Sequence, residues 1–384
     1  MNNPLRPIYL DYNGTTPHDP EVIAAMRPYL ETEFGNPSSS HWYGIGPRRA
    51  VETARRQVAG LIGCLPEEIV FTSGGTESNN HAIKSAARLM RDKGRHIITS
   101  RVEHPAVLEV CGFLEKEGFA VTYLPVDPTG RVEAQAVKNA ICSDTILISI
   151  MHANNEVGTI EPIKEIAAAA RQENILVHTD AAQSAGKIPV NVDDLGVSLL
   201  SIAGHKLYAP KGVGALYIRK SLHLEPFCHG AGQESGRRAG TENVLEIAGL
   251  GKACEIAAQN LKSTAAHMAE LRDHLQAGLT ETIDPVRVNG HLTHRLPNTL
   301  SVSFCGLEAN RILEEIGLEV AASAGAACHA DTVSVSHVLE AMDLEQNCAK
   351  GTLRFSTGRM TTKDEIERAL EVVTVAVKRL QADA

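Results

Sequence analysis

Residues 199–218 read LLSIAGHKLYAPKGVGALYI, two apolar runs separated by a Gly-His-Lys turn and a Pro/Gly hinge. Apolar runs of this length between small residues are typical of two buried strands joined by a turn. Lys206 stands in that turn, shortly after the first run. If packed apolar segments remove it from water, the pKa of its amine falls, and the free amine can form a Schiff base with an aldehyde cofactor. A surface lysine at a strand end is the commoner alternative, so the assignment depends on the rest of the chain.

The chain before this stretch alternates predicted strands and helices. Such alternation indicates an α/β fold with a mostly parallel sheet covered on both faces, and ligands bound at the carboxyl ends of the strands. A helix at 44–61 carries Arg48, Arg49, Arg55 and Arg56, which we expect to form a solvated face. The other predicted strands are 68–72, 96–100, 120–126, 145–151 and 175–179, and the helices between them include 105–116, 134–140 and 163–172.

The composition is that of an ordinary folded enzyme. With 384 residues, 43% hydrophobic and 22% charged, the chain can form a large domain and a smaller one. A net charge of -9, without a dense basic run, argues against nucleic acid or an anionic membrane as a partner. Residues 1–10 lack the features of a signal peptide, and no stretch has the length of a membrane span, so we expect a cytoplasmic location.

The eight cysteines are scattered, with no Cys-x-x-Cys pair and no spacing of a zinc site. In a reducing compartment we expect most of them to be inert thiols. Cys328 differs, because it lies in the small-residue segment 321–331, which predicts a mobile, exposed loop. The adjacent His329 would favour its thiolate.

Residues 73–78, Ser-Gly-Gly-Thr-Glu-Ser, turn from a predicted strand directly into a predicted helix. Amides at a helix N-terminus bind phosphate well, and glycines let the backbone approach it closely. A tight turn capped by Thr76 or Ser78 is an equally good local interpretation. Because no Gly-x-Gly-x-x-Gly fingerprint and no Walker-type Gly-Lys-Ser/Thr is present, a dinucleotide-binding oxidoreductase is disfavoured.

Asp180 and Lys206 both follow predicted strands. Pyridoxal phosphate (PLP) needs a lysine for its aldehyde, a carboxylate that keeps its ring nitrogen protonated, and a cradle for its phosphate. These two residues and the turn at 73–78 supply all three. Each residue alone is more often structural, but together they predict a PLP site. Further polar residues at strand ends could contact the ring face or its phenolic oxygen, namely His104, Asn155 and Gln183.

Eight segments resemble, in order, the motifs of the NifS/IscS-like cysteine desulfurases of the class V aminotransferase superfamily. The resemblance spans nearly the whole chain. It implies a fold-type-I PLP-dependent transferase, normally a homodimer, whose large domain has a mostly parallel sheet and whose smaller C-terminal domain is also α/β. The segments are 8–12, 71–78, 103–104, 151–158, 180–184, 204–206, 238–241 and 353–356.

The resemblance also implies a role for each site residue. Lys206 would form the Schiff base, Asp180 would pair with the pyridinium nitrogen, and His104 would stack on the ring as an acid/base group. Cys328 would take sulfur from the substrate as a persulfide and leave alanine. The remaining roles are Asn155 and Gln183 beside the phenolic oxygen; Gly75, Thr76, His205 and the other subunit's Thr241 at the phosphate; and Asn13, Asn155 and Arg354 at the substrate carboxylate, which suits the guanidinium fork.

Three features depart from the desulfurase pattern. Ala203 replaces a usual serine whose hydroxyl helps to bind phosphate, and the segment 325–329, Gly-Ala-Ala-Cys-His, is closer to that of selenocysteine lyases. The chain also ends at Ala384, without the longer tail that docks an iron-sulfur scaffold, which puts a dedicated role in cluster assembly in doubt. Since a selenol ionises near neutral pH and a thiol does not, a site that does little to deprotonate its substrate favours selenocysteine.

We therefore predict an enzyme of sulfur or selenium metabolism that converts L-cysteine or L-selenocysteine to L-alanine, with a persulfide or a selenide product at Cys328 and an acceptor protein as a further partner. The alternatives are a selenocysteine-specific lyase, a PLP aminotransferase and a sulfur-transfer scaffold without cofactor. We expect residues 15–257 to form the large PLP-binding domain, and 1–14 with 258–384 to form the small domain. A long helix from 242 to 279 would connect them.

Overall fold

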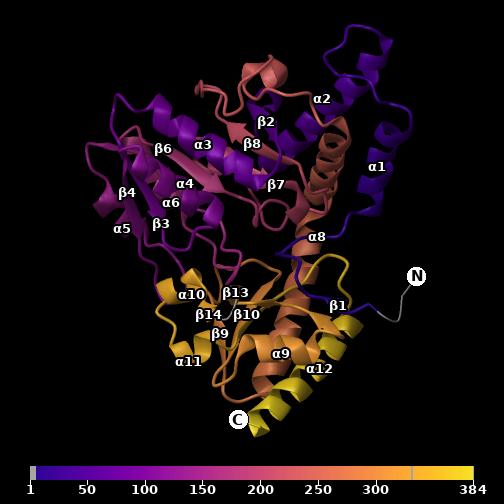
Figure 1. Cartoon of the computed structure of the whole chain (residues 1–384), viewed down its shortest axis with the longest axis vertical. Helices are drawn as coiled ribbons and strands as arrows, with labels where there is room; N and C mark the ends of the chain where they lie inside the picture. The colour runs from indigo at the N-terminus through magenta and orange to yellow at the C-terminus, as the bar shows by residue number, and fades with distance from the viewer. Residues whose placement is uncertain (1–5, 330–331, 384) are drawn as a thin grey trace.

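A seven-stranded sheet forms the centre of the larger part of the molecule. The computed structural model describes residues 6–329 and 332–383, and of residues 326–329 and 332–334 it describes the backbone. The strands follow the order β2-β8-β7-β6-β5-β3-β4 (Figure 1). β8 is antiparallel to both neighbours and the other pairs are parallel, which confirms the prediction. The strands are β2 (Ile69–Thr72), β3 (His96–Ser100), β4 (Ala120–Leu124), β5 (Thr145–Ser149), β6 (Leu176–Asp180), β7 (Leu199–Ala203) and β8 (Gly214–Ile218).

Both faces of this sheet are buried. Successive strand residues such as Ile97 and Ile98 point to opposite faces and join two different apolar cores. One core contains α3 (Gly75–Leu89) and α4 (Pro105–Lys116). Because neither face of the sheet meets water, most residues of its strands are apolar. Helices that contribute to the other core are α1 (Pro20–Glu31), α2 (Trp42–Ile62), α5 (Ala134–Ala140), α6 (Ile163–Gln172), α7 (Val192–Leu195) and α8 (Val244–Thr282).

A smaller, antiparallel sheet lies at the other end of the molecule (Figure 1). Its order is β12-β15-β10-β9, and its core is shared with α9 (Ala309–Ile316), α12 (Lys363–Ala382) and α8. The N-terminal strand β1 (Ile8–Tyr9) pairs in parallel with β11 (Val320–Ala321), so the start of the chain joins this part. Further elements of this part are β9 (Val286–Asn289), β10 (Thr299–Phe304), β12 (Ser323–Ala324), β15 (Thr352–Ser356), α10 (His337–Ala341) and α11 (Gln346–Ala349).

The long helix α8 connects the two parts, as predicted, although it ends three residues later than expected. Its first half packs on α1 and α2, where Leu250 is fully buried. Its second half buries Leu275 and Leu279 against the smaller sheet. No helix in the described part of the chain is both long and apolar enough to cross a membrane.

The expectation that Arg55 belongs to a solvated face is wrong. Arg55 is 8% exposed, and its guanidinium donates to both carboxylate oxygens of Glu234, at 2.8 and 2.7 Å. The same carboxylate accepts from the amide of Phe71 on β2. Burying an arginine costs free energy, and the bidentate pair with Glu234 offsets that cost. Because Glu234 is 179 residues away in the sequence, no local sequence pattern could have predicted the pair.

The segment around Cys328 also differs from the predicted loop. Its backbone forms a hairpin in which β13 (Ala326–His329) pairs with β14 (Thr332–Val335). Main-chain hydrogen bonds define such a hairpin, so small side chains without apolar alternation do not prevent it. The side chain of Cys328 lies outside the described residues.

Two of the cysteines depart from the expectation of free thiols. Cys305, after β10, and Cys348, on α11, form a disulfide, with a Cα–Cα distance of 4.0 Å. Burial raises the pKa of the Cys64 and Cys111 thiols to about 12, which fits the expected inert character. The described residues contain no cluster of metal-ligating side chains.

Candidate active site

A cavity of about 220 Å³ opens at the carboxyl ends of β6 and β7, beside the start of α3. Parallel strands place the residues that follow them at one edge of the sheet, and this edge is where ligands bind in such folds. The structure brings most of the predicted site residues to this cavity. The predicted residues that line it are Asn13, Gly75, Thr76, His104, Asn155, Asp180, Gln183, His205, Lys206 and Arg354.

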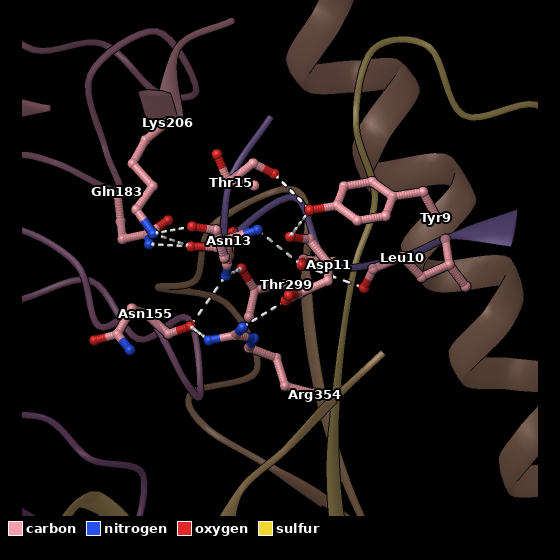
Figure 2. A network of polar contacts seen from close by, with 12 residues as sticks. Tyr9, Leu10, Asp11, Asn13, Thr15, Asn155, Gln183, Lys206, Thr299 and Arg354 are labelled. Carbon is pink, nitrogen blue, oxygen red and sulfur yellow. Dashed lines mark hydrogen bonds and ion pairs between the residues drawn. The ribbon is translucent and has the colours of Figure 1, made fainter. Parts of the chain in front are cut away.

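Lys206 ends a short 3-10 turn that directly follows β7. Its ammonium donates to the carbonyl oxygens of Asn13 and of Gly14, the latter at 2.6 Å (Figure 2). Burial and then Arg354 lower the pKa of Lys206 to about 8, although Asp11 and Asp180 oppose the shift. The amine therefore loses its proton much more readily than an exposed lysine, as a nucleophile at this position requires.

Asp180 is the last residue of β6 and is 7% exposed. One of its carboxylate oxygens accepts from the side-chain amide of Asn79 at 2.6 Å, and the other accepts from the backbone amide of Ala182 at 2.9 Å. Asn79 lines the same cavity, and its own amide oxygen is buried without a hydrogen-bond partner in the described part of the chain. These contacts hold a carboxylate in a fixed position at the cavity wall.

The turn before α3 has the geometry of an anion cradle. Gly74 has a φ of 144°, a conformation that residues with side chains rarely adopt. A Cβ atom on Gly75 would come within 3.2 Å of the Cβ of Ala203, so the helix start approaches the end of β7 closely. His205 is hydrogen-bonded to the hydroxyl of Thr15 at 3.1 Å, and burial followed by Lys206 lowers its pKa to about 4. His205 is therefore neutral and can donate one N–H to an anion.

His104 is the N-cap of α4, because its Nδ1 accepts from the backbone amide of Ala106 at 3.1 Å. This bond makes Nε2 the nitrogen that carries the proton in the neutral ring. Loss of hydration lowers the pKa of His104, with Asp180 opposing and Lys206 adding to the shift. The ring is thus held neutral at the cavity, with a tautomer fixed by the backbone.

Arg354 reaches the cavity from β15 of the smaller sheet. One of its terminal nitrogens pairs with Asp11 at 2.6 Å, and the other donates to the carbonyl oxygen of Asn155 at 3.0 Å (Figure 2). Its Nε is buried without a partner among the described residues. An arginine held in this way and still short of one acceptor suits a small carboxylate.

Two predicted residues are not placed in this cavity. Thr241 is exposed and does not line it, and its contribution to the site of another subunit stays a prediction. Cys328 lies on the β13–β14 hairpin, of which only the backbone is described.

Three residues near the cavity received no role from sequence reasoning. Asp11 holds Arg354, Asn79 holds Asp180, and Lys187 contacts Gln183. Asn79 follows Gly75 by four residues on the same helix, so helical spacing gave a weak signal for it, whereas Lys187 stands in a turn and gave none. Asp11 lies in one of the recognised segments, but its partner is 343 residues away.

The residues present fit PLP. An amine with a lowered pKa, a fixed carboxylate and a glycine turn at a helix start are the three groups that PLP needs, and they share one cavity. Asp180, Lys206 and the Gly74–Gly75 turn would hold the ring nitrogen, the aldehyde carbon and the phosphate respectively. Ala203 also lines the cavity and offers no hydroxyl to the phosphate.

Comparisons with known proteins agree with this assignment. The chain is 51% identical over 377 residues to the cysteine desulfurase IscS of Dictyoglomus turgidum, a match that covers 98% of this chain and 96% of that protein. It is 48% identical to the cysteine desulfurase IscS of Methanosarcina thermophila, over 97% and 93% of the two chains.

Solved structures show the same likeness. A NifS-like protein superposes with a TM-score of 0.91 at 38% identity, over 97% of this chain and all of the other. SspA in complex with cysteine superposes with a TM-score of 0.82 at 38% identity, over 92% and 99% of the two chains. The family model for class-V aminotransferases matches residues 8–369. The chain therefore belongs to the class-V aminotransferase family, whose fold is the fold type I of PLP-dependent enzymes.

Proposed function

We propose that this protein is a PLP-dependent cysteine desulfurase that converts L-cysteine to L-alanine and leaves the sulfur on Cys328 as a persulfide. The observation that carries the proposal is the single cavity shared by Lys206, Asp180, His104 and Arg354. The named relatives support it, since they are cysteine desulfurases over nearly the whole length of the chain. PLP supplies the electron sink that weakens bonds at the substrate's α- and β-carbons.

Each residue has a task that its contacts allow. Arg354, held by Asp11, binds the substrate carboxylate through its free Nε, with Asn13 and Asn155 beside it. Lys206 would hold the aldehyde and would move a proton at the substrate's α-carbon, because its lowered pKa lets the amine exist as a free base.

Three tasks remain at the ring and at the sulfur. Asp180 would keep the ring nitrogen protonated, and His104 would lie against the face of the ring. The Cys328 thiolate attacks the substrate sulfur, so that an S–S bond forms, the C–S bond breaks, and its electron pair leaves with the carbon, which is then protonated to alanine.

The assembly that we propose is a homodimer in which Thr241 reaches the partner's phosphate site. Thr241 is exposed and outside its own cavity. Large apolar side chains also lie exposed around the start of α2, where Phe34 is 77%, Trp42 72% and Tyr43 52% exposed. An exposed apolar group of this kind favours a protein interface. Residues 15–257 would form the large domain, and residues 1–14 with 258–384 the small one.

The preference for sulfur or selenium is tested by comparing the rates of alanine formation from L-cysteine and L-selenocysteine. We expect alanine to form from L-cysteine at a rate within about tenfold of that from L-selenocysteine, because the lowered pKa values of Lys206 and His104 let both side chains accept a proton near the substrate. The measurement compares kcat/KM for the two amino acids with the same enzyme preparation. A rate on cysteine lower by about a thousandfold would instead support the selenocysteine-specific lyase, for which Ala203 and the sequence around Cys328 provide the argument.

The lowered pKa of Lys206 predicts how the rate of PLP binding depends on pH. In protein freed of PLP, we expect the rate of Schiff-base formation to rise with pH, with a midpoint near pH 8 at which half of the Lys206 amine has lost its proton, and to level off about one pH unit higher. The reason is that the pKa of Lys206 lies well below the ordinary value of 10.5. Stopped-flow absorbance after mixing with PLP checks this, and Arg354→Leu should move the midpoint upward. A rate that keeps rising to about pH 10 contradicts the assigned environment of the lysine.

A further inference from the structure

A second lysine lies directly behind the cavity. Lys187 is 5% exposed, and its amine donates to the side-chain oxygen of Gln183 at 2.7 Å and to that of Asn13 at 3.0 Å. It does not line the main cavity. It borders instead a separate cavity of about 20 Å³, which is large enough for one water molecule and is also bordered by Lys206.

Close packing of the turn 181–187 against the segment of Lys206 places Lys187 beside the small cavity. Lys187 stands at the end of this turn, which follows β6, and Gly186 in the turn has a φ of 74°. A Cβ atom on Gly186 would overlap the side chain of Leu207, the neighbour of Lys206. The turn can therefore press against the Lys206 segment only with glycine at this position, and the two lysines lie on either side of Asn13.

A buried lysine needs a physical reason, since lysines are almost never fully buried unless paired. Burial, followed by the nearby cations Lys206 and Arg354, lowers the pKa of Lys187 well below 10.5. No carboxylate among the described residues forms an ion pair with it. Its amine therefore contributes as a hydrogen-bond donor to two amide oxygens and not as half of a salt bridge.

Two hydrogen bonds fix the direction in which the side-chain amide of Gln183 faces, one from Lys187 and one to the carbonyl of Asn13. In the described chain, Lys187 is the only donor to the Gln183 side-chain oxygen. The amide nitrogen of Gln183 consequently points the other way and donates to the carbonyl oxygen of Asn13 at 3.0 Å. The amine of Lys206 donates to that same carbonyl, so the N–H end of Gln183 lies beside the Schiff-base nitrogen (Figure 2).

Asn13 depends less on Lys187 than Gln183 does. Its side-chain oxygen also accepts from Asn298 at 2.9 Å, and its amide nitrogen donates to the hydroxyl of Thr299 at 2.8 Å. Loss of the lysine amine would thus leave Asn13 held, but the side-chain amide of Gln183 would keep only its bond to the Asn13 carbonyl and would be less firmly fixed.

We infer that Lys187 is a positioning residue that fixes the side-chain amide of Gln183 with its N–H toward the phenolic oxygen of PLP. The inference rests on the proposed function. A donor at that oxygen competes for the proton that the oxygen shares with the Schiff-base nitrogen, and so it makes the Schiff base easier to deprotonate. Lys187 therefore helps to set the acidity of the Schiff base without touching the cofactor.

The test is a pH titration of the Schiff-base absorption band in the purified holoenzyme. In Lys187→Met, which nearly preserves side-chain length and volume, we expect the pKa of the Schiff base to rise by about one unit, a tenfold change in acidity. Gln183→Leu should produce a similar rise. The double variant should rise no further than Gln183→Leu alone, because the lysine acts through the glutamine. Lys262→Met, which removes an exposed lysine on α8, should leave the titration unchanged.

Other outcomes overturn the inference. An unshifted titration in Lys187→Met, with reduced thermal stability, would give Lys187 a purely structural role, and additive shifts in the double variant would mean that it acts independently of Gln183. If Lys187→Met does not fold, Lys187→Leu is measured, which likewise lacks a donor, and an unshifted titration there has the same meaning. A wild-type protein without any Schiff-base band would refute the proposed function itself, which distinguishes the two failures.

Discussion

Lys206→Ala is expected to abolish the covalent attachment of PLP and to lower the rate of alanine formation by about 10⁴-fold or more. Lys206 is the lysine whose amine reaches the main cavity, and burial with Arg354 lowers its pKa to about 8. Alanine at this position leaves the carboxylate and phosphate contacts in place but removes the amine that holds the aldehyde and moves the α-proton. Absorption spectroscopy of the purified variant and a steady-state assay with L-cysteine provide the two measurements.

A matched control is Lys211→Ala, which removes an exposed lysine five residues further along the chain and should retain both the band and the rate. The informative contrary result is a Lys206→Ala protein that keeps its Schiff-base band. That outcome would move the attachment point to another lysine, and Lys187, which borders the same small cavity as Lys206, is the first candidate.

Cys328→Ser is expected to retain bound PLP and its absorption band while losing at least about 10³-fold in alanine production from L-cysteine. The serine hydroxyl cannot accept the sulfur as a persulfide, so the C–S bond has no nucleophile to complete its cleavage. Amino-acid analysis for alanine and detection of protein-bound sulfur by alkylation and mass spectrometry check the two halves of the expectation.

Cys142→Ser is the control, since Cys142 is an exposed thiol outside the site. If Cys328→Ser retained full activity on L-cysteine, the protein would be better described as a PLP aminotransferase of the same family, because such an enzyme has no use for the thiol.

Much of the fold follows from local sequence. Strand-length apolar runs alternating with helices predicted the parallel part of the sheet, because burial of both faces leaves a continuous apolar signal in each strand. The strand ends then predicted which polar residues meet at the cavity, since parallel strands bring their carboxyl ends to one edge. The antiparallel placement of β8 between β2 and β7 depends on tertiary pairing.

The features that sequence could not predict depend on partners far along the chain. Arg55 is buried because Glu234 meets it, and Asp11 holds Arg354 across 343 residues. Lys187 resembles any lysine near a turn until the contacts with Gln183 and Asn13 are known. The hairpin of β13 and β14 is formed by backbone hydrogen bonds, for which the small side chains around Cys328 give little periodic signal.

The position of Asn13 has a consequence for the order in which the protein can mature during synthesis. Asn13 is translated 343 residues before Ser356, yet its backbone amide donates to the hydroxyl of Ser356, and its side chain contacts Asn298 and Thr299. Its carbonyl is also where Lys206 and Gln183 meet. Because synthesis proceeds from the N-terminus, this carbonyl reaches its final place only after the strand that ends at Ser356 has emerged. A nascent chain therefore cannot complete its cofactor pocket until the strand that ends at Ser356 has been translated, which delays chemistry until that stage of synthesis.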